Sequence, residues 1–346
     1  MRNLLFVLLF SYLPIALNAQ LDDLLKNPDV SYVATFETEH DFRLSSKRET
    51  SDLQLFKFDF QNKGCADFRN DNWLARWLLQ GMKNGIYRAY ESIDLSVIVT
   101  HTTLLNKITT IDTVITFDPD TYEETMRVIK NELNPDDIKS FRTLQAIYYH
   151  KKTGNFQTRL LAIAPMVDIT DPQGNVNGKM PLAWLAMDGK LADGLSVQSP
   201  DVAWAALLLD RVNTLKISEL KLKKNEMKKT FAEQLFQEAI SMKHPVESSE
   251  GYGCKNMLTR KEIDAMTNSI DTVITFDPET YKETMQIGKS EYTTAKLKQV
   301  LLAQEWYYDG SRHLIATKLK AIAPMVDVYD DKNTFMYSRR QYYLHF

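Results

Sequence analysis

A nine-residue phrase, IDTVITFDP, occurs twice in this chain of 346 residues. The first copy covers residues 111–119 and the second covers residues 270–278, so the copies lie 159 positions apart. The same offset holds without insertion across residues 111–168, where 29 of 58 residues are identical in the two copies. Solenoid repeats have periods of roughly 20–50 residues. The sequence therefore predicts that a domain-sized unit is present twice, in tandem.

Length and composition agree with two globular domains. Domains have roughly 100–200 residues each, and a chain with 44% hydrophobic and 25% charged residues is of ordinary globular composition. The net charge of −3 gives no electrostatic reason to expect nucleic acid as a partner. Two cysteines are too few for a disulfide-dense scaffold or a four-thiolate zinc site.

Residues 1–19 have the pattern of a secretory signal peptide. Arg2 supplies the positive start, residues 4–10 form an apolar run, and small residues precede a cleavage position after Ala19. The apolar stretch ends before Pro14, short of the roughly 20 residues that span a bilayer. No cysteine follows the cleavage position, which excludes a lipoprotein anchor. We expect an exported, periplasmic protein without a transmembrane segment after cleavage.

Helices are expected in several places. Residues 71–90 carry Trp73, Trp77 and further apolar residues at helical spacing. Asn134 and Pro135 favour the start of a short helix running to about Arg142, and Thr293 favours the matching helix in the second copy, to about Val300. A long helix is expected over residues 215–242, and its lysines are interpreted as a solvated face rather than a binding site.

The repeated phrase alternates apolar and polar residues and predicts a strand that ends at Asp118 and Pro119. The residues after it fit either a helix or a returning strand. Gly288 stands in the second copy where the first has Ile129, and glycine is costly inside a helix, which favours a hairpin around residues 118–123. Two more hairpins are expected, from residues 144–149 with 156–167 and from 301–308 with 314–326.

These elements predict an α+β fold with two tandem copies of a unit in which helices pack on antiparallel β-hairpins. Within residues 20–70, which have no counterpart before the second copy, residues 53–60 alternate as a strand would. The expected segments are a signal peptide at 1–19, a leader at 20–70, a first unit at 71–212 and a second unit at 213–346.

No catalytic or metal-binding pattern is found in the sequence. The chain has no G-x-S-x-G, P-loop or H-E-x-x-H pattern, and no two of its six histidines have the i, i+4 spacing of a metal site. Asp112 and Asp118 share a strand face about 20 Å apart, whereas an acid–base pair needs roughly 5–9.5 Å. We expect a protein that is not an enzyme and has no cofactor, although a hydrolase with dispersed catalytic residues stays an alternative.

Three groups of residues are singled out for other reasons. Cys65 and Cys254 are not related by the offset, and after export they form either one disulfide or two buried thiols. Aromatic residues in the extended runs are candidates for contacts with a partner, which leaves a secreted peptide- or glycan-binding protein as a second hypothesis. These aromatic candidates are Tyr148, Tyr149, Trp184, Trp306, Tyr307 and Tyr308. The repeated structural positions are Asp118, Pro119, Tyr122 and Pro165, with Asp277, Pro278, Tyr281 and Pro324.

Several of these segments resemble one known family. They are Asp112-Thr113-Val114, then Asp118 to Glu124, Lys130 to Ile138, Ile163-Ala164-Pro165 and Pro181-Leu182-Ala183-Trp184. In this order they are similar to the GldN family of Bacteroidetes, also called PorN. The similarity covers about residues 70–190 and, in the second copy, about 260–330. The family has one such unit where this chain has two.

The resemblance implies a periplasmic, non-enzymatic component of the gliding-motility and type IX secretion machinery. Family members assemble into rings with an outer-membrane lipoprotein, GldK or PorK. They also contact the periplasmic part of an inner-membrane motor protein, GldM or PorM. The expected partners are therefore a GldK/PorK-like lipoprotein, a GldM/PorM-like motor protein and further copies of the chain in a ring.

Overall fold

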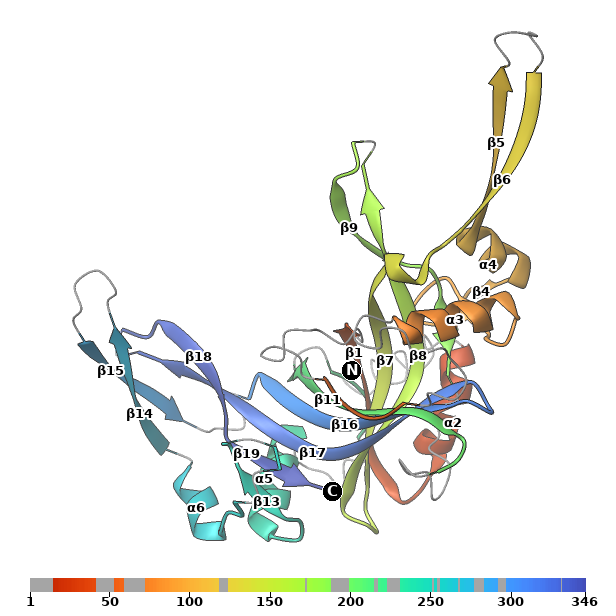
Figure 1. The fold of residues 1–346 in the computed structure, drawn as a ribbon. Helices are drawn as coiled ribbons and strands as arrows, with labels where there is room; N and C mark the ends of the chain where they lie inside the picture. Colours follow the sequence, from red (N-terminus) through yellow and green to blue (C-terminus); the bar gives the residue numbers. More distant parts are fainter. Residues whose placement is uncertain are drawn as a thin grey trace, which may run out of the picture.

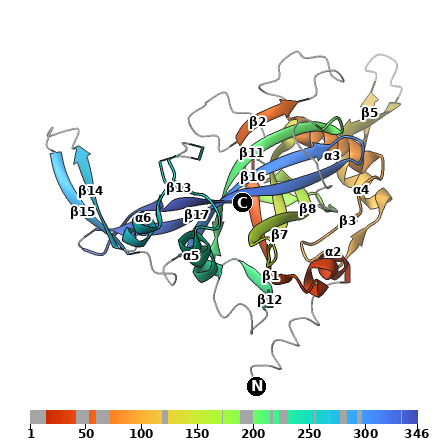
Figure 2. The ribbon, with the colours of Figure 1, turned by 90° about the horizontal axis from the view of Figure 1, so that it is seen from below.

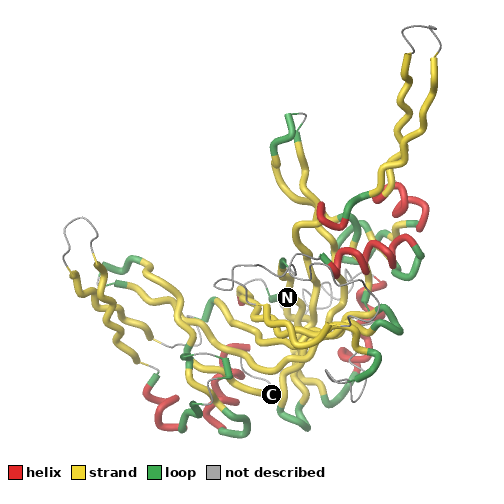
Figure 3. Tube along the Cα trace, in the orientation of Figure 1, coloured by secondary structure: helices red, strands yellow, loops and turns green. Residues whose placement is uncertain are grey.

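The structure is a computed structural model, and it describes the parts of the chain given at the end of this paragraph. Antiparallel β-strands dominate these parts, and the helices are few and lie at the margins of the sheets (Figures 1 and 3). The described residues are 15–41, 53–58, 72–117, 124–171, 173–187, 199–214, 217–222, 231–250, 252–253, 256–266, 268–276, 283–291, 297–330 and 332–346.

The first sheet has eight strands in the order β12-β1-β7-β8-β10-β3-β4, with β9 beside β8. Its strands are β1 (Val30–His40), β3 (Ala89–Tyr90), β4 (Ile98–Val99), β7 (Ile138–His150), β8 (Asn155–Thr170), β9 (Val176–Pro181), β10 (Trp184–Ala186) and β12 (Ser218–Leu222).

The second sheet has nine strands in the order β13-β19-β17-β16-β11-β2, and β18, β14 and β15 are attached through β17. Its strands are β2 (Leu53–Phe58), β11 (Val202–Asn213), β13 (Val246–Ser248), β14 (Asn268–Phe276), β15 (Glu283–Glu291), β16 (Gln299–Asp309), β17 (Leu314–Tyr329), β18 (Phe335–Arg340) and β19 (Tyr342–His345).

The other elements are a separate two-stranded hairpin and short helices. The hairpin consists of β5 (Thr109–Phe117) and β6 (Glu124–Glu132). The helices are α2 (Ile15–Lys26), α3 (Trp73–Lys83), α4 (His101–Ile108), α5 (Phe231–Ser241) and α6 (Arg260–Ala265), with a 3-10 turn η1 (Pro135–Asp137).

The two large sheets are built in the same order. Reading β12-β1-β7-β8-β10-β3 against β2-β11-β16-β17-β19-β13 pairs six strands of the first sheet with six of the second. Strands β8 and β9 begin and end 159 residues before β17 and β18, and the separate hairpin β5–β6 begins and ends 159 residues before β14–β15. The offset seen in the amino-acid sequence is therefore also an offset between structural elements.

Strand β1, which lies in the leader, has its structural counterpart in β11. Strand β1 pairs with β7 as β11 pairs with β16, and in both pairs the register shifts at the matching place, between Val30 and Tyr32 and between Val202 and Trp204. Such bulges bend a strand and fix its register. The leader therefore supplies a central strand of the first sheet, and residues 202–213 supply the same strand of the second.

The next strand along the chain is exchanged between the sheets. Strand β2 follows β1 in sequence but pairs with β11, whereas β12 follows β11 but pairs with β1. The register shift lies between Val33 and Ala34 in one pair and between Ala205 and Ala206 in the other, again at matching places. Each sheet is thus completed by a strand from the other half of the chain.

The helices that follow the exchanged strands also pack against the sheet of the other half of the chain. In α3, which follows β2, the Trp73 ring lies 4.0 Å from the ring of Trp204 on β11. In α5, which follows β12, the Phe231 ring stacks 5.8 Å from the ring of Tyr32 on β1. Tyr32 and Trp204 occupy matching register positions on β1 and β11. The exchanged segment in each half is therefore a strand together with a helix.

Residues related by the offset touch each other where the sheets meet. The amide of Gln304 donates to the side-chain oxygen of Gln145 at 2.9 Å, and the hydroxyls of Thr158 and Thr317 lie 3.3 Å apart. In each pair the residues are 159 positions apart, and a residue that contacts its own counterpart lies on a two-fold axis. The two sheets are arranged as the two subunits of a symmetric dimer would be.

The core lies between the two sheets and beneath the exchanged helices. One buried cluster joins Phe141 and Leu160 of the first sheet to Trp306 of the second under α3. A second cluster joins Phe36 of the first sheet to Leu319 of the second under α5. Each half of the molecule is therefore completed by apolar side chains of the other half.

The expected fold class is wrong. The described chain is mostly antiparallel β-sheet in two large sheets, rather than an α+β fold in which helices pack on hairpins. One cause is the region expected to form a long helix over residues 215–242, where the structure has strand β12 and only the shorter helix α5. Another is β11, which is buried along most of its length and so does not alternate as a half-buried strand does.

Individual element predictions fared better than the fold class. A helix is confirmed within the expected range 71–90, but α3 ends at Lys83 and residues 89–90 form strand β3. The strand expected at 53–60 is confirmed as β2, and the returning strand after the repeated phrase as β6. The other two hairpins are confirmed as β7–β8 and β16–β17. The helix expected to reach Arg142 is only the turn η1, capped by Asn134, and Val300 lies in strand β16.

Candidate assembly surface

Among the described residues, the four most exposed large apolar side chains lie on two projecting hairpins, Ile111, Met126 and Val128 on one and Met285 on the other. We call β5–β6, residues 109–132, the first arm and β14–β15, residues 268–291, the second arm. In Figures 1 and 2 the arms project at opposite ends of the molecule. Both contain the repeated phrase within or next to their first strand. The two arms are therefore related sequences at two places in the fold, with 16 of 24 residues identical.

One face of the first arm is apolar and exposed. The register pairs Ile111 with Lys130, Thr113 with Val128 and Ile115 with Met126, and paired residues project from the same face of an antiparallel ladder. The exposed fractions of the large apolar side chains on this face are 69% for Ile111, 59% for Ile115, 69% for Met126 and 64% for Val128. Exposed apolar side chains that lie together mark interaction sites.

The second arm repeats this register position for position. Strand β14 pairs with β15 so that Ile270 is opposite Lys289, Thr272 opposite Ile287 and Ile274 opposite Met285. Met285 is 68% exposed, almost the same as its counterpart Met126. This arm is joined to the second sheet by the pairing of Lys289 with Tyr329 on β17.

The first arm is held at its base by polar contacts. The backbone N–H of Leu133 donates to the carbonyl of Ile108 at 2.8 Å, closing the base of the hairpin. The Glu132 carboxylate accepts from Lys83 of α3 and, at 2.9 Å, from Lys130. These two ammonium groups, Lys83 first, lower the pKa of Glu132 to about 2. The arm is thus fixed to α3 at its base, while its apolar face points into solvent.

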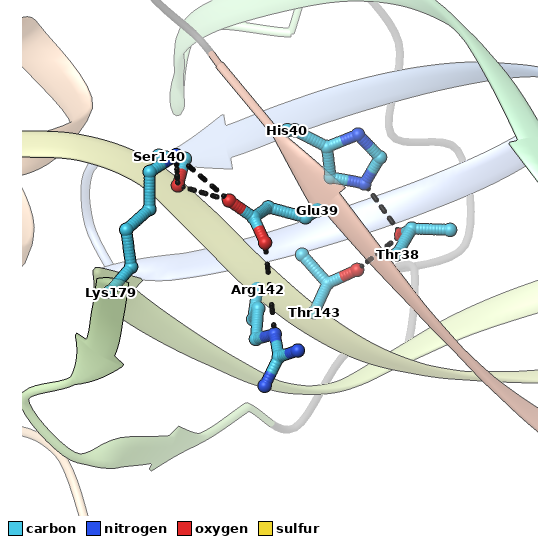
Figure 4. Close-up of polar contacts among 7 residues, drawn as sticks. All are labelled: Thr38, Glu39, His40, Ser140, Arg142, Thr143 and Lys179. Carbon is cyan, nitrogen blue, oxygen red and sulfur yellow. Dashed lines mark hydrogen bonds and ion pairs between the residues drawn. The ribbon is translucent and has the colours of Figure 1, made fainter. Parts of the chain in front are cut away.

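A polar cluster on β1 and β7 contains a histidine with reactive potential (Figure 4). Nε2 of His40 lies 2.6 Å from the Thr38 hydroxyl, as Figure 4 shows. Its Nδ1 lies 2.9 Å from the carboxylate of Asp210, which the figure does not draw. Both His40 and Asp210 are buried, and the Thr38 hydroxyl also lies 2.7 Å from the Thr143 hydroxyl. Because Asp210 lies on β11 and the others on the first sheet, this group connects the two sheets.

A carboxylate beside this cluster joins three neighbouring segments. Glu39 accepts from the Ser140 hydroxyl at 2.6 Å and from the Lys179 ammonium of β9 at 3.2 Å, and Arg142 lies 3.8 Å away (Figure 4). The Ser140 hydrogen bond, with the Lys179 and Arg142 charges, lowers the pKa of Glu39. These contacts fix β9 to the edge of β1 and β7.

The residues singled out in the sequence are distributed unevenly. Five of the aromatic candidates are buried inside the fold, and Tyr148 is half-buried. Their role in contacts with a partner stays a prediction. Pro165 and Pro324 lie within β8 and β17. The other named residues, Cys65, Cys254, Asp118, Pro119, Tyr122, Asp277, Pro278 and Tyr281, lie outside the described residues.

The described part of the chain offers neither a cluster of metal ligands nor a membrane-spanning helix. Among these residues, no group of three or more histidine, cysteine, aspartate or glutamate side chains is arranged to hold a metal ion. In the same residues, no helix has both the length and the apolar character that crossing a membrane requires.

Residues 53–189 match the family described as gliding motility associated protein GldN. This segment of the chain is similar to the GldN family. The match starts at the first residue of β2 and ends beyond β10, so it includes the first arm, one strand of the second sheet and six strands of the first. No curated protein matches the chain.

The similarity of residues 53–189 to the GldN family indicates a broad class of function. The family consists of structural components of gliding motility and type IX secretion. A component of this kind works through its surfaces, so the arms are the features of most interest. Sequence reasoning identified the repeated phrase but not its exposure, since alternating isoleucine and threonine is equally typical of a strand with one buried face.

Proposed function

We propose that this chain is a periplasmic structural adaptor of the gliding and type IX secretion machinery. It is exported by the signal peptide at residues 1–19 and lies at the inner face of the outer membrane. There it binds a GldK/PorK-like lipoprotein and a GldM/PorM-like motor protein, and it takes part in a ring. The match of residues 53–189 to the GldN family carries this proposal.

The exposed arms support a role in assembly rather than catalysis. A two-stranded hairpin is marginally stable by itself in water, and the first arm presents a row of large apolar side chains without covering them. Such a surface is expected where another protein binds. The reactive cluster at His40, in contrast, is buried between the sheets.

We also propose that the second sheet is a second GldN-like unit, with first and second units at about residues 71–212 and 213–346. The common strand order and the shared offset support this. The described strands add residues 30–40 to the first unit and residues 202–213 to the second, because β1 and β11 occupy matching places.

The experiment is recovery of the tagged full chain from its own cells, after fractionation of the envelope and mild crosslinking. We expect the chain in the periplasmic or outer-membrane fraction, joined to a lipoprotein of the GldK/PorK type and to the motor protein. Deletion of the gene should impair gliding or cargo export, and the intact gene should restore it. Recovery of the chain as a monomer without envelope partners would contradict the proposal.

The alternative of a secreted peptide- or glycan-binding protein gains no support from the described surface. It depended on exposed aromatic side chains in the extended runs. Trp306, Tyr307 and Tyr308 are buried.

A further inference from the structure

A polar group near the internal two-fold axis is different in the two halves of the chain. We call residues 15–187 the first half and residues 199–346 the second half. In the register of the central strands, Thr38 on β1 occupies the position of Asp210 on β11. The ring of His40 lies 2.6 Å from the Thr38 hydroxyl and 2.9 Å from the Asp210 carboxylate. Because one ring can reach a residue and its counterpart only near the axis, this group lies where the halves meet.

The residues around this group are polar in the first half and apolar in the second. Val212 on β11 occupies the position of His40 on β1, and it is buried in the cluster under α5. Thr143, whose hydroxyl lies 2.7 Å from that of Thr38, is matched by Leu302 in the same cluster. The first half therefore supplies an imidazole and two hydroxyls, whereas the second half supplies a carboxylate and two aliphatic side chains.

The imidazole and the carboxylate each depend on the other half. Asp210 is 4% exposed, and in the described part of the chain its second oxygen has no hydrogen-bond donor, so Nδ1 of His40 faces the one oxygen that is paired. The ring of His40 also packs edge-on against Trp306 of the second half, with 5.7 Å between ring centroids. Burying an ionised carboxylate is costly unless a donor or an opposite charge faces it. Loss of the imidazole would leave this carboxylate without compensation.

The pairing of two like halves would leave these groups without their partners. Two second halves would bury Asp210 beside a second Asp210, with valine at both positions that correspond to His40. Two first halves would bury two imidazoles beside two threonines, without a carboxylate. The contacts on the axis do not discriminate, because they join identical residues, Gln145 with Gln304 and Thr158 with Thr317. Discrimination between partners needs a cost against the wrong one as well as contacts with the right one.

We propose that the group of His40 and Asp210 makes each half of the chain select the other half and reject a second copy of itself. The interface between the sheets thus has one fitting partner, the unlike half. This goes beyond the proposed function and does not depend on it, since it concerns the two halves alone. Where many copies of the chain lie close together, the group prevents like halves of neighbouring copies from pairing.

The first experiment reproduces the like pairings inside the full chain. One block variant gives the first half the residues of the second, and the other block variant does the reverse. Each is expected to lower the midpoint of urea unfolding by about 1 M or more, because buried groups lose their partners. The substitutions are Thr38→Asp, His40→Val and Thr143→Leu in the first block, and Asp210→Thr, Val212→His and Leu302→Thr in the second.

A combined variant with all six substitutions moves the whole group to the other side of the axis. It should recover at least half of the midpoint lost by the block variants, because one imidazole again faces one carboxylate. A combined variant that loses as much as the two blocks added together would overturn the proposal, and so would block variants as stable as the wild type. If the block variants do not fold, a folded combined variant supports the proposal and an unfolded one overturns it.

The second experiment tests the choice of partner directly. The full chain, with a protease site within residues 188–198, is prepared with two different C-terminal tags, and both preparations are cleaved, mixed in urea and refolded. Capture through one tag should recover the first half, with little of the second half that carries the other tag. In His40→Val/Asp210→Thr, where like pairing buries no unpaired ring or carboxylate, recovery of the other tag should increase several-fold. Equal recovery in the wild type and the variant would overturn the proposal and leave the adaptor function untouched.

Discussion

Buried polar side chains at the centre of the protein fix the position of one sheet against the other. Gln304 is fully buried, and its amide donates to Gln145 at 2.9 Å and to the Thr158 hydroxyl at 2.8 Å. A buried polar group costs free energy unless it is hydrogen-bonded, so this group stabilises one relative placement of the sheets over others.

Replacing Gln304 by leucine is therefore expected to destabilise the fold. Gln145 and Thr158 each lose a buried partner, and a loss of this kind costs roughly 1–3 kcal/mol. Urea unfolding of the full chain measures the change. The double variant Gln145→Leu/Gln304→Leu should lose less than the sum of the two single variants, because it removes both members of the pair. A Gln304→Leu protein as stable as the wild type would contradict this account.

The raised pKa of the Tyr308 phenol predicts that the fold loses stability at alkaline pH. Burial, reinforced by the Asp309 charge, raises the pKa of Tyr308 to about 12, above its usual value of 10. The unfolded chain releases this proton near pH 10 and the folded chain near pH 12, so the contribution to stability is complete below pH 10 and is lost as pH rises from 10 to 12. Thermal unfolding at pH 9 and at pH 11 should show a smaller decrease for Tyr308→Phe than for the wild type. Equal decreases would show that this phenol does not contribute.

Among the helices and strands, local sequence patterns predicted the hairpins correctly. They failed for a strand whose two faces are both buried. Residues 111–117 alternate clearly, and Gly288 correctly favoured a returning strand over a helix. Strand β11 is buried on both faces, and its run of alanine and leucine has no period of two. Strand β12 was taken for helix because Leu220 lies on one side of a helical pattern with Met227, Phe231, Leu235 and Met242.

The two arms were likewise predicted only in part. The two copies of the phrase located both arms from the sequence alone. Their exposure could not be predicted, because a strand with one apolar face usually packs that face against a core. Nothing in the sequence singled out the counterpart methionines Met126 and Met285, whose exposure is known only from the structure.

The base of the first arm is expected to loosen in acid. The Glu132 pKa is lowered to about 2 by Lys83 and Lys130, below its usual value of 4.5. Its contribution is therefore present above pH 4.5 and is lost as pH falls from 4.5 towards 2. Hydrogen exchange at Leu133 should accelerate, relative to β7, over that range. In Lys83→Ala the acceleration should be smaller and complete at a higher pH, because the folded-state pKa of Glu132 rises towards 4.5 when the larger of the two causes is removed. An unchanged profile in the variant would contradict the anchoring role.

The whole molecule is organised by contacts between residues far apart in sequence. Strand β1 pairs with β7 across about one hundred residues, and each sheet is completed by a strand from the other half. Local periodicity carries no information on such pairing. The sequence therefore predicted that a unit occurs twice, whereas the exchange of β2–α3 and β12–α5 is known only from the structure.

The exchange predicts that the two halves stay together when the chain is cut between them. A protease site is inserted within residues 188–198, and the folded protein is then cleaved. Because β2 pairs with β11 and β12 pairs with β1, the fragments should co-elute in native gel filtration. Urea should unfold the uncut chain in a single transition, whichever sheet the probe reports on. Separation of the fragments without denaturant would contradict the exchange.

The crossed path of the chain also fixes an order of events during synthesis. Residues 30–40 and 138–170 emerge long before residues 218–222, so one side of β1 has no neighbour until two thirds of the polypeptide has been made. A bare strand side can bind a foreign chain. The first sheet can therefore be completed only after the second half of the chain has been made. A truncated product would expose the side of β1 that β12 covers in the finished protein, and other chains could bind there.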